Sequence, residues 1–150
     1  MKIAIFSGSV YGTAEDVARH AGERLRAAGF EVWHDPRAQL PQVLAFGPDA
    51  LLAVTSTTGM GELPDNLLPL YCAIRDQFPS WHGLPCAVIA LGDASYGDTF
   101  CGGGEQMREL FAELGMREAL EMLRLDASET VTPQTDAEPW LDRLAAALRG

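Results

Sequence analysis

The sequence is poor in cysteine, in basic residues and in long apolar runs. Its three cysteines form no C-x-x-C pair, which argues against a disulfide framework or a zinc site, and its three histidines are scattered. No apolar run approaches the roughly 18 to 20 residues of a membrane span. Lys2 and the four-residue apolar run 3–6 precede the first polar loop, too short a stretch for a signal peptide. We therefore expect a cytoplasmic protein without a metal centre and without a membrane association.

Positive charge is scarce. Lys and Arg total 11 against 21 Asp and Glu, so the formal net charge at pH 7 is -10. Such a surface would be repelled by nucleic-acid phosphates, which argues against a nucleic-acid partner. Two interpretations remain open at this stage: the acidic surface attracts a basic partner protein, or it simply keeps the chain in solution.

The chain alternates strand and helix signals. At 150 residues it is long enough for one domain with a single good core, and it shows no repeat or linker. Apolar patterns predict strands at 2–6, 30–33, 50–55, 85–91 and, more weakly, 120–125. Helices are predicted at 14–28, 66–78 and 104–114, and a last one capped by Asp136 with Pro139 in its first turn. This alternation predicts an α/β fold, a doubly wound parallel sheet of five strands between two helical layers.

Three loops rich in Gly, Ser and Thr follow the first, third and fourth predicted strands. In a parallel sheet these loops share the carboxyl edge, where α/β proteins bind their ligands. The first loop, 9–14, lacks the lysine of a P-loop and the G-x-G-x-x-G of a dinucleotide fingerprint. It offers two hydroxyl groups and free backbone amides at a helix start, which suits a phosphate dianion. The alternative is an ordinary turn capped by Ser9 or Thr13.

The second and third loops have similarly open interpretations. The second holds Gly59 and Gly61, which can expose backbone groups, but it could equally be a flexible connection to a helix capped by Asp65 or Asn66. The third places Tyr96 and Phe100 among small and acidic residues, as expected where an aromatic ring is stacked. Phe100 could instead pack inward on the sheet edge.

Together the three segments SGSVYGTA, STTGMGELPDN and LGDASYGDTFCGG resemble the FMN-binding loops of flavodoxins and of the flavodoxin-like domains of diflavin reductases. The chain is most similar to short-chain flavodoxins of the MioC and YqcA type, and the resemblance covers its whole length. It implies a flavodoxin-like three-layer sandwich with strand order 2-1-3-4-5. The segments are specific because they occur together, in this order and at these spacings.

The resemblance also implies which residues bind FMN. The first loop would wrap the phosphate, the second would run along one edge of the isoalloxazine, and the third would reach its pyrimidine side at Asp93 and stack Tyr96 on a ring face. The implied residues are Ser9, Val10, Tyr11, Gly12, Thr13, Ala14, Ser56, Thr57, Thr58, Gly59, Met60, Leu91, Gly92, Asp93, Tyr96, Phe100, Cys101 and Asp126.

This sequence departs from the family pattern in the second loop. Thr58 stands where many flavodoxins have a second stacking aromatic, so that flavin face would be open or covered by Met60 or Leu63. Met60 itself stands where the family often has an acidic residue. The acidic residues Asp93 and Glu62 near the ring would disfavour an anionic reduced flavin and lower its potential.

The function implied is a low-potential one-electron carrier, not an enzyme, in which the cofactor does the chemistry. We expect a monomer that is reduced by a basic flavodoxin or ferredoxin NADP⁺ reductase and passes electrons to acceptors such as biotin synthase. The alternative on the same fold is an NAD(P)H-dependent flavin or quinone reductase, which needs a nicotinamide site. A phospho-accepting receiver domain is excluded, because its acidic and lysine positions hold Ser7, Thr55 and Asp126 here.

Overall fold

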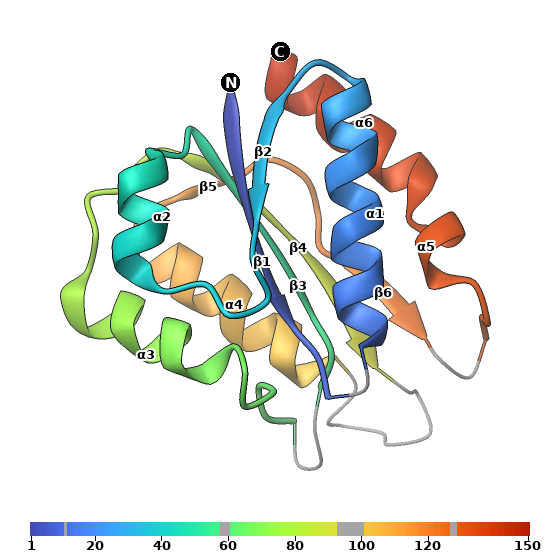
Figure 1. Cartoon of the computed structure of the whole chain (residues 1–150), viewed down its shortest axis with the longest axis horizontal. Helices are drawn as coiled ribbons and strands as arrows, with labels where there is room; N and C mark the ends of the chain where they lie inside the picture. The colour runs from blue at the N-terminus through green and yellow to red at the C-terminus, as the bar shows by residue number, and fades with distance from the viewer. Residues whose placement is uncertain (11, 58–60, 93–100, 127–128) are drawn as a thin grey trace.

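A parallel sheet lies between two layers of helices in the computed structural model (Figure 1). The structure describes residues 1–10, 12–57, 61–92, 101–126 and 129–150. The described strands follow the order β2-β1-β3-β4-β5, and β6 also pairs with β4. Their bounds are β1 Lys2–Gly8, β2 Glu31–His34, β3 Ala50–Thr55, β4 Pro85–Gly92, β5 Arg117–Glu118 and β6 Leu123–Asp126. The predicted fold class and strand order are confirmed.

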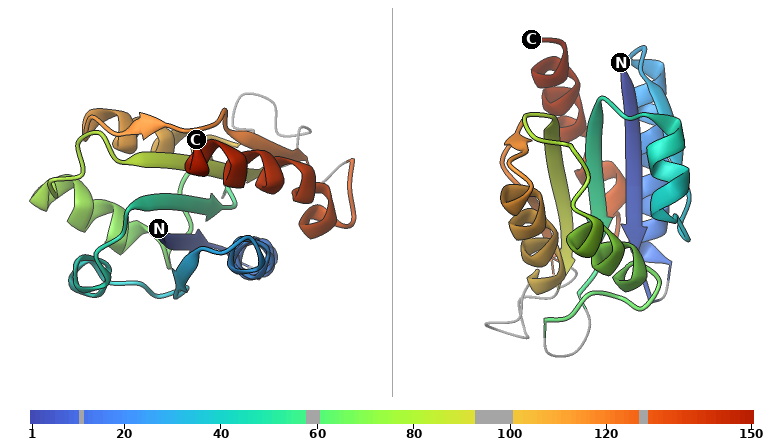
Figure 2. Two further views of the ribbon diagram at one scale, coloured as in Figure 1. Left: turned by 90° about the horizontal axis from the view of Figure 1, so that it is seen from above. Right: turned by 90° about the vertical axis from the view of Figure 1, so that its left-hand side faces the viewer.

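Helices cover both faces of the sheet (Figure 2). Their bounds are α1 Thr13–Ala27, α2 Leu40–Phe46, α3 Leu68–Gln77, α4 Gly102–Glu113, α5 Pro133–Asp136 and α6 Glu138–Arg149. One core cluster joins α1 and α6 to the first face, and a second joins α2, α3 and α4 to the other face. All six residues of β3 are buried, and the first five are apolar, as expected of a strand whose two faces are both covered.

The strongest sequence signals are confirmed. β3 matches its predicted bounds, and β1 and β4 each run slightly beyond theirs at the carboxyl end. Gly29 ends α1 with a φ of 99°. Its N–H donates to the Arg26 carbonyl at 3.0 Å, and the Phe30 N–H donates to the Leu25 carbonyl at 3.1 Å, the paired bonds of a Schellman motif.

The predicted fifth strand at 120–125 is wrong in extent, because two short strands take its place. β5 pairs with the start of β4 (Cys86 opposite Glu118), and β6 pairs with its end (Ile89 opposite Leu123). Between these two pairs β4 advances by three residues, from 86 to 89, while the segment that holds β5 and β6 advances by five, from 118 to 123. The two extra residues interrupt the ladder as a bulge does.

Two helix assignments also need correction. Asp136 does not cap the last helix: it ends α5, and Ala137 is the N-cap of α6. The helix α2 was not predicted at all. It has only seven residues, with a proline in its first turn, a capping box between Gln39 and Gln42, and the left-handed Gly47 at its end. No helix in the described part of the chain is long and apolar enough to cross a membrane.

We expect Gly104→Ala to destabilise the protein, because α4 packs closely on β4 at this position. An added Cβ would lie 2.3 Å from the Cβ of Ala90. Overpacking of this kind costs about 1–3 kcal/mol in the free energy of unfolding. The matched control is Gly22→Ala in α1, where the nearest atom, Cγ1 of Val32, is 3.4 Å away. That variant should gain about 0.5–1 kcal/mol from helix propensity. Urea denaturation followed by circular dichroism measures both, and equal midpoints would contradict the close packing.

Candidate functional site

The carboxyl ends of the central strands meet at one edge of the sheet, the lower edge in Figure 1. Gly8 at the end of β1 pairs with Thr55 at the end of β3, and Thr55 lies opposite Ala90 of β4. Two residues further along, Gly92 pairs with Asp126 at the end of β6. The three loops singled out in the sequence therefore leave the sheet from neighbouring points.

The N-terminus of α1 faces this edge without a side-chain cap. Its N-cap, Gly12, has a φ of 88°, and no side chain accepts a hydrogen bond from the first turn. The first helical bond runs from the Asp16 N–H to the Gly12 carbonyl at 2.9 Å. Within the described ranges, the N–H groups of Thr13 and Ala14 meet no protein acceptor. Neither Ser9 nor Thr13 caps the helix itself, and the helix end presents its amides and dipole to an anion.

Ser9 organises the first loop from within. Its Oγ accepts a hydrogen bond from the Gly12 N–H at 2.7 Å, which leaves its hydroxyl hydrogen available to a ligand. The Ser9 N–H donates to Oδ1 of Asn66 at 2.9 Å. Val10 in the same loop is 55% exposed, so its side chain does not pack in the core.

Asn66 is a residue whose role the sequence analysis missed. It does not cap α3, whose N-cap is Leu67 with no side-chain bond. Its Nδ2 donates instead to the carbonyls of Ser7, at 3.0 Å, and Pro36, at 2.8 Å. An asparagine before a helix is the usual sign of a cap, and nothing in the sequence separates that use from a contact across loops.

The second loop is joined at its described ends to the neighbouring elements. The Ser56 N–H donates to the Gly8 carbonyl at 2.9 Å. Oγ1 of Thr57 accepts from the Gly103 N–H, at the start of α4, at 3.0 Å. Nε2 of Gln106 donates to the Gly61 carbonyl at 2.8 Å. The first two turns of α4 therefore hold the second loop, and Ser56 joins it to the end of β1, where the first loop begins.

The third loop begins and ends in well-packed structure. Leu91 is buried, Gly92 is half-buried, and Cys101 at the N-cap of α4 is fully buried. The Cys101 thiol lies 3.6 Å from the Ala90 carbonyl, and burial raises the pKa of this thiol to about 11. The side chain therefore packs in the core as a protonated thiol.

Several predicted site residues lie outside the described residues. They are Tyr11, Thr58, Gly59, Met60, Asp93, Tyr96 and Phe100. The described ones that the structure brings to the carboxyl edge are Ser9, Val10, Gly12, Thr13, Ala14, Ser56, Thr57, Leu91, Gly92, Cys101 and Asp126. Across residues 1–10, 12–57, 61–92, 101–126 and 129–150, no group of three or more His, Cys, Asp or Glu could hold a metal ion.

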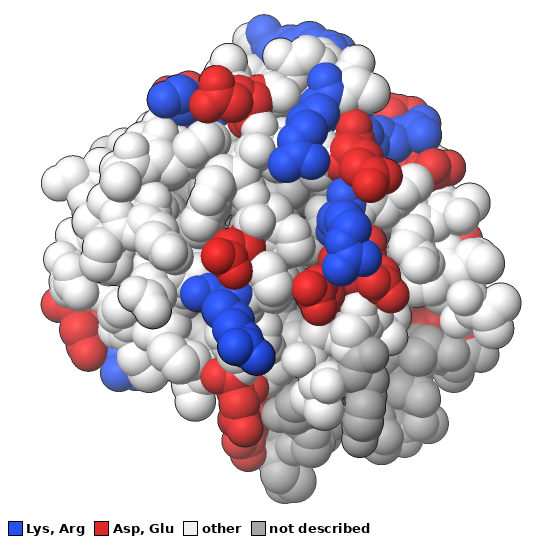
Figure 3. All heavy atoms as spheres, viewed as in Figure 1, with Lys and Arg blue, Asp and Glu red and all other residues white. Residues whose placement is uncertain are grey.

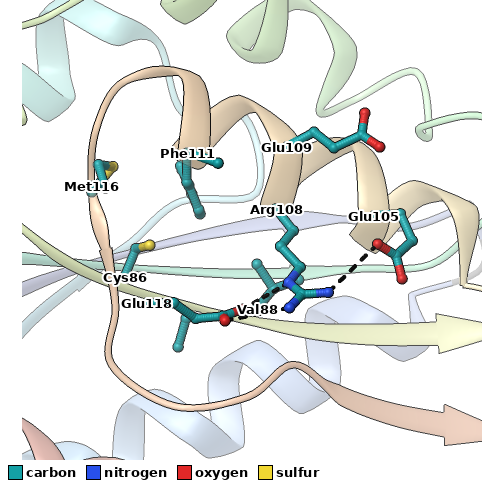
Figure 4. A pocket seen from close by; sticks show the side chains of 10 residues that line it. Cys86, Val88, Glu105, Arg108, Glu109, Phe111, Met116 and Glu118 are labelled. Carbon is teal, nitrogen blue, oxygen red and sulfur yellow. Dashed lines mark hydrogen bonds and ion pairs between the residues drawn. The ribbon is translucent and has the colours of Figure 1, made fainter.

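A separate hollow of about 410 Å³ lies between α4, β4 and β5 (Figure 4). Its floor is apolar, with Val88 and Phe111, and Arg108 spans to Glu118 at 2.7 Å. Burial raises the pKa of Cys86, which also lines it, to about 12, so its thiol stays protonated. This hollow has no cradle of free donors and no reactive group, and the carboxyl edge remains the candidate site.

Known proteins share the whole architecture of this chain. The family model for flavodoxin matches residues 5–140. Flavodoxin YqcA of Escherichia coli strain K12 is 41% identical over 144 residues, 95% of each chain, and protein MioC of the same strain is 36% identical over 141 residues, 93% of this chain and 92% of that protein. A solved structure of a C101S mutant of a flavodoxin from Pseudomonas aeruginosa is 74% identical over the full length of both chains, with a TM-score of 0.97.

We expect His34 to make the protein less stable in mild acid. Its Nε2 shares a 2.8 Å hydrogen bond with Oγ of the buried Ser7. Burial lowers the pKa of His34; Glu15 and Asp35 act against that shift, and Arg19 and Arg26 add to it. The unfolded chain then binds the proton more readily, so stability is complete above the unfolded pKa of about 6.5 and falls as the pH drops below it.

The melting temperatures of wild type and His34→Gln at pH 7.5 and pH 5.5 test this. Glutamine keeps a polar group at the position but removes the titration, so the acid-induced drop should be smaller in the variant. His82→Gln, at an exposed position, controls for the loss of one histidine. A drop of the same size in wild type and His34→Gln would show that His34 does not contribute.

Proposed function

This chain belongs to the flavodoxin family, and from that premise we propose that it binds one FMN at the carboxyl edge of the sheet and carries electrons one at a time between a reductase and its acceptors. The observation that carries the proposal is the uncapped N-terminus of α1, with the Ser9 hydroxyl beside it and the second loop fixed alongside.

The described donors fit the phosphate of FMN. The N–H groups of Thr13 and Ala14, the hydroxyls of Ser9 and Thr13, and the positive end of α1, a helix of 15 residues, form a neutral set suited to a dianion. The first turn of α1 carries Glu15 and Asp16, whose negative charge would oppose an anion. The guanidinium of Arg19 lies 3.5 Å from the Glu15 carboxylate and 3.0 Å from that of Asp16, and it offsets their charge. The cradle therefore needs no lysine of its own.

Bound FMN would supply the redox chemistry, and the chain would supply binding, orientation and charge. Ser56 and Thr57 lie where the second loop leaves β3, next to the start of α4, and they are placed to border the ring system. Gly92 and Asp126, paired at the ends of β4 and β6, would border it from the other side. The sequence-based assignments of Asp93 and Tyr96 belong to the same proposal.

The surface charge favours a basic redox partner. On the face in Figure 3, basic side chains lie next to acidic ones. Arg24, for example, contacts Glu138 at 3.1 Å and Asp142 at 2.8 Å. Because such basic residues are already paired, the electrostatic field at longer range is set by the excess of acidic residues, in keeping with the net charge of -10, and it would attract a basic partner. The partners proposed from family resemblance are flavodoxin or ferredoxin NADP⁺ reductases and, as an acceptor, biotin synthase.

The phosphate contact predicts how two substitutions of Gly12 will differ. At a φ of 88° a side chain is strained, but an added Cβ meets nothing within 4 Å. Asparagine and aspartate both tolerate this left-handed conformation and are nearly the same size, but aspartate is charged and lacks the N–H donors of the amide. Gly12→Asp should weaken FMN at least about tenfold relative to Gly12→Asn, because a carboxylate would stand beside a dianion. Riboflavin, which has no phosphate, should bind the two variants alike.

Fluorescence titration of the apoprotein with each flavin gives the four affinities, and the wild type should take up one FMN per chain. Equal FMN affinities for the two variants would mean that the first loop does not hold the phosphate. A wild type that binds neither flavin would overturn the proposed function itself.

As a carrier, the FMN-loaded chain should not oxidise NADPH at a useful rate on its own. With a ferredoxin or flavodoxin NADP⁺ reductase it should be reduced rapidly, and the rate should fall about tenfold or more between low salt and about 0.5 M salt, where opposite charges are screened. Stopped-flow absorbance of the flavin measures both rates. Fast oxidation of NADPH by the chain alone would favour the flavin or quinone reductase alternative.

A further inference from the structure

We propose that Asn66 is the positioning residue of the first loop, and that it decides which donors the loop presents to a phosphate. The inference rests on the proposed function for the identity of the ligand. Asn66 lies just before α3 and is half-buried. Its side chain contacts the first loop, the end of β1 and the segment after β2.

Three hydrogen bonds hold the carboxamide in place. Oδ1 accepts from the Ser9 N–H at 2.9 Å. The two hydrogens on Nδ2 are used by the carbonyls of Ser7, at 3.0 Å, and Pro36, at 2.8 Å. A primary amide has two donor hydrogens, so this arrangement uses both of them and fixes which end of the group faces Ser9.

The two carbonyls that Asn66 contacts belong to β1 and to the segment directly after β2. Ser7 belongs to β1 and is 2% exposed, and its Oγ is held by Nε2 of His34 at 2.8 Å. Pro36 follows β2, the neighbour of β1 in the sheet. Asn66 therefore links the first loop, through Ser9, to the end of β1 and to the segment after β2.

From Asn66 a chain of hydrogen bonds leads to the helix. The Ser9 N–H donates to Asn66, the Gly12 N–H donates to Ser9 Oγ at 2.7 Å, and the Asp16 N–H donates to the Gly12 carbonyl at 2.9 Å. The N–H groups of Ser9 and Gly12 are thus already hydrogen-bonded within the protein. These two amides are not available to a phosphate, whereas those of Thr13 and Ala14 and the hydroxyl groups of the loop remain available to it.

Two substitutions separate the roles of the carboxamide. Asn66→Asp is nearly the same size and keeps the acceptor for Ser9, but it replaces both donors and turns a charged oxygen toward two carbonyls. Asn66→Ala removes all three bonds. Asp65→Ala, at the exposed neighbouring position, is the matched control. We expect both Asn66 variants to lose about tenfold or more in FMN affinity and less than about threefold in riboflavin affinity, while the control keeps both.

Titration of the apoproteins with FMN and riboflavin, with melting temperatures recorded alongside, measures this ratio. An FMN-to-riboflavin affinity ratio unchanged in folded Asn66 variants would overturn the proposal, since a purely structural residue would weaken both flavins together. If the wild type bound neither flavin, the proposed function would fail separately.

Amide hydrogen exchange in the wild type tests the same bonds without any substitution. In the ligand-free protein the Ser9 and Gly12 amides should exchange at least about tenfold more slowly than those of Thr13 and Ala14, because only the first pair is hydrogen-bonded. Adding FMN should slow the second pair. Rapid exchange at Ser9 and Gly12 in the ligand-free protein would overturn the positioning role, whether or not the Asn66 variants fold.

Discussion

Parallel pairing of β1, β3 and β4 is the constraint on which the rest of this molecule depends. The three strands are buried on both faces, and their register sets Gly8 opposite Thr55 and Thr55 opposite Ala90. Because all three run in the same direction, every connection after them must begin at one edge and return across a helical layer. The hydrophobic burial that stabilises the sheet thereby brings together loops that are far apart in the sequence.

Hydrogen bonds then convert this proximity into a defined shape. Side chains from one segment form hydrogen bonds with main-chain groups of another. Asn66 accepts from the Ser9 N–H, Thr57 accepts from the Gly103 N–H, and Gln106 donates to the Gly61 carbonyl. Each bond uses a neutral group, which matters in a chain whose net charge is -10. A helix terminus and hydroxyl groups can attract an anion locally while the surface as a whole stays negative, so the proposed FMN phosphate and the proposed basic partners are compatible with one another.

Much of this could be predicted from the sequence, and the failures have physical causes. Continuous apolar runs located β3 and β4 well, because strands covered on both faces leave little ambiguity. The seven-residue α2 was missed because its amphipathic pattern spans barely two turns. The break between β5 and β6 depends on register against β4, which no local pattern encodes. The three loops were found by composition, but the contacts of Asn66 were not, since they join residues 30 to 59 positions apart.

The break between β5 and β6 also affects the outer edge of the sheet, where a second chain could pair. An exposed sheet edge offers unpaired main-chain groups on which a strand of another chain can assemble. Here one edge consists of two short strands, the charged residues Arg117–Glu118 of β5 and the four residues of β6. Between them the indole N–H of Trp140 donates to the Glu121 carbonyl at 2.9 Å. The opposite edge, β2, is itself only four residues long. Short and interrupted borders of this kind are one of the means by which natural sheets resist edge-to-edge pairing.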